Sequence, residues 1–127
     1  MAFIQERLLA ADRLVVAAPI FFMGLNAQTK ILIDRLQPFW VLKYVLNRPV
    51  IVKSDRPRRR GMFLSAAGTK APDVFTCAQR AIRLSYKMLE VEYAEECLYG
   101  GVDAVGEIVA HPTARREVEE AVIRLVE

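Results

Sequence analysis

The chain has 127 residues, 54% of them hydrophobic, and a formal net charge of +3, which fits one domain with a substantial core. No apolar run approaches the roughly 20 residues of a membrane span, and no signal peptide is recognisable, so we expect a cytoplasmic protein without a membrane partner. Cys77 and Cys97 lack the spacing of a metal site. Both lie among apolar residues, which predicts buried free thiols.

The first third of the chain predicts a helix, a strand and a second helix. Residues 2–11 form an amphipathic pattern, and the uninterrupted apolar run 14–18 is typical of a central parallel strand covered on both faces. Pro19 and the aromatic residues after it predict a loop with apolar faces. Asn26 is a favourable N-cap for a helix that we expect to end at Pro38.

The middle of the chain is less regular. The apolar segment 39–46 is ambiguous, and we place it in a loop or a short helix at an interface. Residues 49–60 are irregular and basic, with a brief extended piece at 50–52. The cluster 56–60 is able to contact phosphates or nucleic acid, but a solvated loop is the more common role of such a cluster, and we expect no nucleic-acid partner.

The second half repeats the alternation of strands and helices. Strands are predicted at 62–66 and 91–98, with a loop of small residues at 65–70 and a strongly amphipathic helix at 73–89. His111 precedes a last helix that begins at Pro112, so we expect it to be a structural cap. Such alternation predicts an α/β fold, with a parallel sheet between two layers of helices.

Several segments together resemble one family, the NADPH-dependent FMN reductases of the flavodoxin-like fold, and most nearly its iron–sulfur flavoprotein and quinone reductase branch. The first group of matching segments is Pro-Ile-Phe-Phe at 19–22, Asn-Ala-Gln at 26–28 and Ile-Asp-Arg at 33–35. The second group lies at 61–65, 68–70, 91–94, 101–103 and 106–108. The order of the segments carries the resemblance, because each of them alone is weak.

The resemblance implies a single, partial flavodoxin-like domain over residues 1–127. In the family a five-stranded parallel sheet binds FMN, and residues 14–18, 62–66 and 91–98 would be its strands three to five. Strand one, its phosphate loop, the first helix and strand two have no counterpart, and the clustered cysteines of the iron–sulfur branch are absent. Ala18, Phe21 and Met23 stand where the family usually has serine, often tyrosine and commonly glycine.

By the same resemblance, two neighbouring loops would hold the flavin ring through apolar faces and backbone N–H groups, with the Thr69 hydroxyl beside them. The implied cofactor-binding residues are Pro19, Ile20, Phe21, Phe22, Met23, Ser65, Ala66, Gly68 and Thr69. No catalytic side chain or metal is implied, because the flavin carries the hydride chemistry. Apart from the resemblance, a Phe-Phe pair after a strand is more often core than cofactor contact, and Ser65 and Thr69 are ordinary turn residues.

Two functions remain open. The first is an FMN-dependent NAD(P)H oxidoreductase acting on a flavin, a quinone or another small electron acceptor, or the ring-binding part of such an enzyme. The alternative is a non-catalytic flavodoxin-like module for protein interaction or oligomerisation. In either case strand 14–18 would lack its neighbour, and a bare apolar edge invites pairing. We therefore expect a homo-oligomer, a separate complementing chain at that edge, or an upstream half that this sequence omits.

Overall fold

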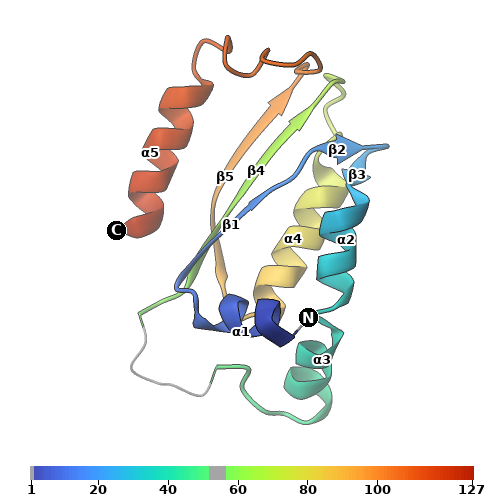
Figure 1. Cartoon of the computed structure of the whole chain (residues 1–127), viewed down its shortest axis with the longest axis vertical. Helices are drawn as coiled ribbons and strands as arrows, with labels where there is room; N and C mark the ends of the chain where they lie inside the picture. The colour runs from blue at the N-terminus through green and yellow to red at the C-terminus, as the bar shows by residue number, and fades with distance from the viewer. Residues whose placement is uncertain (1, 52–56) are drawn as a thin grey trace.

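The computed structural model describes residues 2–51 and 57–127, which contain a three-stranded parallel sheet. The strands β1 (Arg13–Ala17), β4 (Arg60–Ala67) and β5 (Glu92–Gly100) lie side by side in the order β1–β4–β5. Val16 of β1 lies opposite Phe63 of β4, which lies opposite Glu96 of β5. The three arrows point the same way in Figure 1. The predicted strands and the parallel α/β class are therefore confirmed.

Helices cover the two faces of this sheet. The helices α2 (Ala27–Asp34) and α4 (Thr76–Met88) lie on one face and α5 (Ala114–Val126) on the other (Figure 1). Phe63 is buried in the first layer together with Tyr86, whereas its neighbour Met62 packs against Leu125 of α5. Successive residues of β4 thus fill two separate cores, as expected for a strand between two layers.

Tyr86 of α4 explains why the second residue of β4 is a glycine, Gly61. The Tyr86 hydroxyl donates to the Met62 carbonyl oxygen at 2.6 Å, and its ring lies where a Cβ atom on Gly61 would stand. Burial raises the pKa of the Tyr86 phenol, so it remains a neutral hydrogen-bond donor. Any side chain at position 61 would displace this ring from the core.

Arg59 corrects the prediction of a solvated basic loop. Its side chain is 5% exposed and donates to the carbonyl oxygens of Ala11, at 2.8 Å, of Leu8 and of Leu89. It therefore joins the end of α1 (Ala2–Ala10) to the end of α4. Arg56 and Val52, which belong to the predicted cluster and extended piece, lie outside the described residues.

The segment after β1, predicted as a loop with apolar faces, is a short β-hairpin. Strands β2 (Ile20–Phe21) and β3 (Gly24–Leu25) pair antiparallel, with Phe22 and Met23 between them. Both turn residues have positive φ, 48° and 63°. That combination is typical of a two-residue type I′ turn, which normally carries Asn-Gly. The turn cannot be recognised from its residue types, because neither phenylalanine nor methionine favours this conformation.

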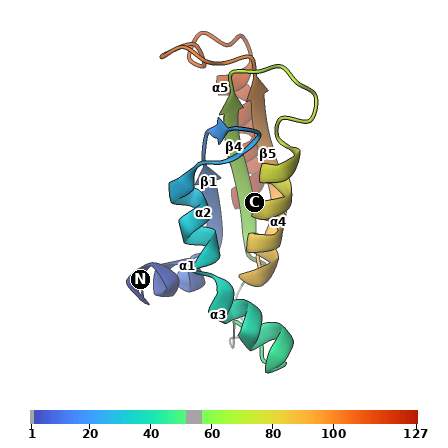
Figure 2. The same ribbon diagram turned by 90° about the vertical axis from the view of Figure 1, so that its right-hand side faces the viewer.

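Pro38 begins a helix instead of ending one. Helix α2 ends at Asp34, and α3 (Gln37–Trp40) follows with Pro38 in its first turn, where a missing N–H costs nothing. A π-helical turn, η1 (Val41–Val45), continues from α3. The helical alternative for segment 39–46 is thus confirmed. Figure 2 looks onto the layer that α2, α3 and α4 form.

Two further predictions need correction, and a third is confirmed. β1 is an edge strand covered on one face only: Leu14 is buried, but Val15 is 50% exposed and Ala17 is exposed, because α5 packs on β4 and β5. Cys97 is buried as expected, whereas Cys77 is exposed at the start of α4. The His111 cap is confirmed, since its Nδ1 accepts the Ala114 N–H at 3.1 Å. Within the described residues no helix has the length and apolarity of a membrane span.

Candidate functional site

The loops after the three parallel strands meet at one edge of the sheet (top of Figure 1). The Ala18 N–H donates to the Leu64 carbonyl oxygen at 3.1 Å, which joins the end of β1 to β4. The Val102 N–H donates to the Ala67 oxygen at 3.0 Å and the Gly101 N–H to the Thr69 oxygen at 3.1 Å. These bonds fix the loops relative to one another. Open α/β sheets bind ligands at this carboxyl edge.

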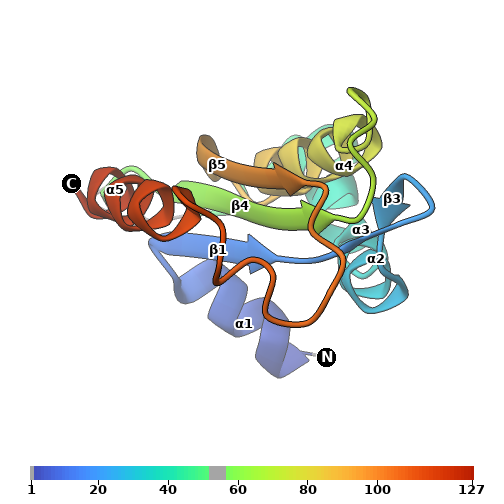
Figure 3. The same ribbon diagram turned by 90° about the horizontal axis from the view of Figure 1, so that it is seen from above.

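An apolar groove of about 400 Å³ opens at this edge, on the face that carries α5. Its lining residues are Ala17, Ala18, Pro19, Leu64, Ser65, Ala66, Tyr99, Ile108 and Val118. Figure 3 shows the loop between β5 and α5 passing the end of β1, which brings Ile108 into the lining. Of the predicted cofactor-binding residues, the groove brings together Pro19, Ser65 and Ala66. The Ser65 hydroxyl donates to the Ala18 carbonyl oxygen at 2.7 Å, so it is engaged within the fold.

The other predicted residues of the first loop form the hairpin. Ile20 is 9% exposed and packs into the core with Phe63. Phe21 is 62% exposed, Phe22 is fully exposed and Met23 is partly exposed. The hairpin therefore presents two aromatic side chains to solvent, not three apolar faces, and neither of them lines the groove.

The loop after β4 offers backbone donors. Gly68, Thr69 and Lys70 are exposed, and within the described chain none of their N–H groups has a hydrogen-bond acceptor. The Thr69 hydroxyl accepts the Ala71 N–H at 3.2 Å. A Cβ atom on Gly68 would lie 2.7 Å from an Asp103 carboxylate oxygen, so a side chain at position 68 would require the Asp103 side chain to move. These three donors could bind the polar edge of a ligand.

Two carboxylates near the groove, those of Glu107 and Glu117, form hydrogen bonds within the fold. The Glu107 carboxylate accepts the Asp103 N–H at 2.7 Å and the Ala104 N–H at 2.9 Å, which lowers the pKa of Glu107. Burial raises the pKa of the Tyr99 phenol, whose hydroxyl lies 3.0 Å from the Glu117 carboxylate and donates to it. The described residues that line the groove include no basic side chain.

Sequence reasoning missed six lining residues: Ala17, Ala18, Leu64, Tyr99, Ile108 and Val118. The alternation of Cys97 and Tyr99 along β5 indicates one shared face, and both pack toward α5. No local signal identifies Ile108, because its position depends on the path of the loop from β5 to α5.

No family model and no curated protein sequence matches the chain. Among solved structures it is similar to the Trp repressor binding protein from Bacillus subtilis, with 17% identity and a TM-score of 0.68 over 94% of this chain and 70% of that one. An FMN-dependent NADH-azoreductase from Bacillus anthracis, in complex with FMN, gives 17% identity and a TM-score of 0.67 over 99% and 61%. An NADPH-quinone reductase from P. pentosaceus has 11% identity and a TM-score of 0.62 over 98% of this chain and 73% of that one.

These likenesses establish a flavodoxin-like arrangement of strands and helices. The chain spans 61% to 73% of the length of these three structures, so they contain further segments that it does not match.

Proposed function

We propose that this chain binds the isoalloxazine ring of FMN at the carboxyl edge of its sheet and acts as the ring-binding part of an NAD(P)H-dependent flavin or quinone reductase. The observation that carries the proposal is an apolar groove at the carboxyl edge of the sheet, where the loops that follow the strands also expose Phe21 and Phe22 and the open N–H groups of Gly68, Thr69 and Lys70. The similarity in fold to an FMN complex supports the choice of ligand.

The residues fit the ring. Isoalloxazine is a flat, largely apolar plate with polar edges, and ligands of that kind take apolar walls and a few fixed donors. Phe21 and Phe22 offer aromatic faces, and the loop 68–70 offers backbone donors, held in place by the bond from the Gly101 N–H to the Thr69 carbonyl oxygen. When bound, the flavin accepts hydride from NAD(P)H and passes electrons to an acceptor. The chain binds and orients the ring and shields it from water.

The residues do not fit the phosphate of FMN. Phosphate sites use helix N-termini, glycine-rich loops or basic side chains, and the lining of the groove has Ser65 as its one hydroxyl side chain besides Tyr99. Both hydroxyls already bond within the fold. The phosphate must therefore be held by groups outside this groove.

The open edge of β1 is the place where such groups could attach. In a parallel strand, every second residue bonds to the same neighbouring strand. The Ala18 N–H donates to β4, so the backbone N–H and carbonyl groups of Val15 and Ala17 point to the opposite, open edge of β1. Within the described chain these backbone groups have no hydrogen-bond partner. Unpaired edges of this kind accept another strand. We propose that a complementing segment pairs here and supplies the phosphate contacts next to the end of β1.

Flavin titration tests the proposal. On this proposal the chain contacts the ring of the flavin and not its phosphate. Binding should therefore quench the fluorescence of riboflavin and of FMN alike, with dissociation constants within about threefold of each other. If neither riboflavin nor FMN bound, the proposed recognition of the ring would be contradicted. Binding of FMN at least ten times more tightly than riboflavin would contradict our placement of the phosphate outside this chain.

The alternative, a non-catalytic interaction module, is favoured by the same open edge and by exposed apolar side chains in α3 and η1, among them Trp40, Tyr44 and Val45. It predicts association with a protein partner and no flavin binding.

A further inference from the structure

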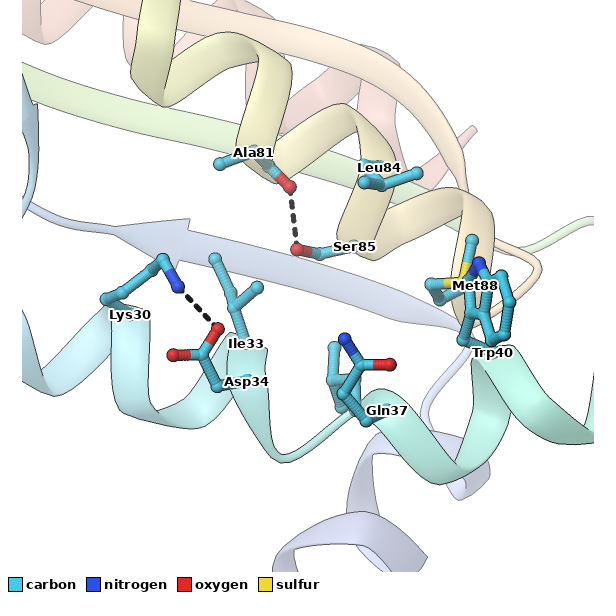
Figure 4. Close-up of a pocket in the computed structure, with 10 residues that line it drawn as sticks. Lys30, Ile33, Asp34, Gln37, Trp40, Ala81, Leu84, Ser85 and Met88 are labelled. Atoms are coloured by element: carbon cyan, nitrogen blue, oxygen red, sulfur yellow. Dashed lines mark hydrogen bonds and ion pairs between the residues drawn. The ribbon is translucent and has the colours of Figure 1, made fainter.

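Two charged side chains at the carboxyl edge, those of Lys70 and Asp103, have no hydrogen bond or ion pair among the described residues. Both are exposed, and they belong to neighbouring loops, the one after β4 and the one after β5. In a groove of about 210 Å³ in the helix layer, by contrast, Lys30 pairs with Asp34 and the Ser85 hydroxyl donates within α4 (Figure 4). The charges at the carboxyl edge therefore remain available to a ligand.

The two loops hold these side chains against each other's glycines. The Asp103 carboxylate lies where a side chain on Gly68 would stand, with one oxygen 2.7 Å from that Cβ position. The Lys70 stem in turn lies over Gly101, whose Cβ position is 2.5 Å from the lysine Cε atom. Each side chain thus occupies the space that a glycine leaves in the opposite loop, and Asp103 is placed beside the backbone of the 68–70 loop.

Hydrogen bonds also fix the backbone around Asp103. The Asp103 N–H donates to the Glu107 carboxylate at 2.7 Å, and the preceding Val102 N–H donates to the Ala67 carbonyl oxygen at 3.0 Å. Groups that are held in this way keep their geometry before a ligand arrives. The result is a fixed carboxylate beside the three backbone N–H groups of residues 68–70, which have no acceptor within the described chain.

This set of groups selects a neutral ligand that both donates and accepts hydrogen bonds. An anion could accept from the N–H groups, but the carboxylates of Asp103 and Glu107 would repel it, and Lys70 is the one ammonium group that the two loops carry. A carboxylate only accepts and a backbone N–H only donates. Their complement is an imide, in which an N–H lies between two carbonyl groups, as at the pyrimidine end of isoalloxazine.

We propose that Asp103 accepts the N3–H of the flavin ring, while N–H groups of the 68–70 loop donate to the carbonyl oxygens on either side of it. Asp103 is then a specificity-determining residue, which selects ligands that carry an imide. The inference rests on the proposed function and adds to it a contact from the loop after β5. A methyl group on N3 removes the donor and places carbon against the carboxylate, so an analogue methylated there should bind more weakly.

Titration with riboflavin and with 3-methylriboflavin, each followed by quenching of flavin fluorescence, tests this contact. The unaltered chain should bind riboflavin about tenfold more tightly, as expected for one exposed hydrogen bond to a charged group. Asp103→Ala should lose affinity for riboflavin and bind the two flavins within about twofold of each other. Asp103→Asn keeps an acceptor oxygen and should still prefer riboflavin at least about threefold. Asp73→Ala is the matched control, because it removes another exposed carboxylate, in the turn before α4, and should keep the tenfold preference.

The outcomes separate this inference from the proposed function. If riboflavin does not bind the unaltered chain, both fail together. If riboflavin binds and its 3-methyl analogue binds equally well, only the role of Asp103 is overturned. The same conclusion follows if Asp103→Ala keeps the preference or if Asp73→Ala loses it. Circular dichroism checks that each variant folds.

Discussion

Replacing Phe22 by asparagine should make the protein more stable while weakening its hold on a flavin. Phe22 has φ 48°, a left-handed conformation that costs an ordinary residue about 1 kcal/mol and that asparagine adopts readily. Its side chain is fully exposed, so no buried contact is lost. We expect Phe22→Asn to raise the free energy of unfolding by about 1 kcal/mol, or roughly 4 °C in Tm for a chain of this size.

The same change removes an aromatic face from the proposed ring site. Stacking between aromatic groups contributes about 1 kcal/mol, so the dissociation constant for riboflavin should rise about fivefold. Phe22→Tyr is the control: it keeps the ring and the strained turn, and both Tm and affinity should stay close to those of the unaltered chain. Thermal unfolding followed by circular dichroism and quenching of flavin fluorescence measure the two effects on the same samples.

The two results test separate steps of the reasoning. A lower Tm for Phe22→Asn would show that the turn is not strained in the way its φ implies. Unchanged flavin affinity together with the expected gain in stability would remove Phe22 from the ring site and leave the groove and the 68–70 loop as its remaining support. Strain retained at a fully exposed aromatic residue is itself a reason to look for a ligand there.

Further variants test the packing around the site. Arg59→Ala should cost about 3 kcal/mol, because three backbone acceptors lose a charged donor, whereas Arg58→Ala, whose side chain is largely exposed, should cost under about 0.5 kcal/mol; urea unfolding measures both. His111→Ala should cost about 1 kcal/mol by removing the acceptor at the start of α5, again by urea unfolding. The pKa of Glu107 in the folded chain lies below its ordinary 4.5, so the stability that this carboxylate contributes is complete above pH 4.5 and is lost as the pH falls through the folded pKa. Glu107→Gln should therefore lower the free energy of unfolding at neutral pH and make that free energy less sensitive to acid. Equal acid sensitivity of the variant and the unaltered chain would count against the bonds of Glu107 to the 103–104 backbone.

The elements that could be predicted from the sequence are those with a strong local pattern. The apolar run around Met62 and the helical repeat through Ala78, Ile82 and Ser85 identify β4 and α4, and all four residues are buried. Alternation of such elements was sufficient for the parallel α/β class. The predicted end of α2, at Pro38, and the predicted start of α4, at residue 73, differ from the observed ends by four and three residues. Hydrogen-bonded turns follow α2 and precede α4, and their sequence continues the helical pattern.

The features that escaped prediction depend on contacts between distant parts of the chain. One arginine in a basic cluster, Arg59, is buried because carbonyl groups from α1 and α4 converge on it, and nothing in the cluster distinguishes it. Ile20 and Phe21 are adjacent and equally apolar, yet the hairpin buries the first and exposes the second. The predicted loop therefore contributed Pro19 to the groove but sent Ile20 into the core.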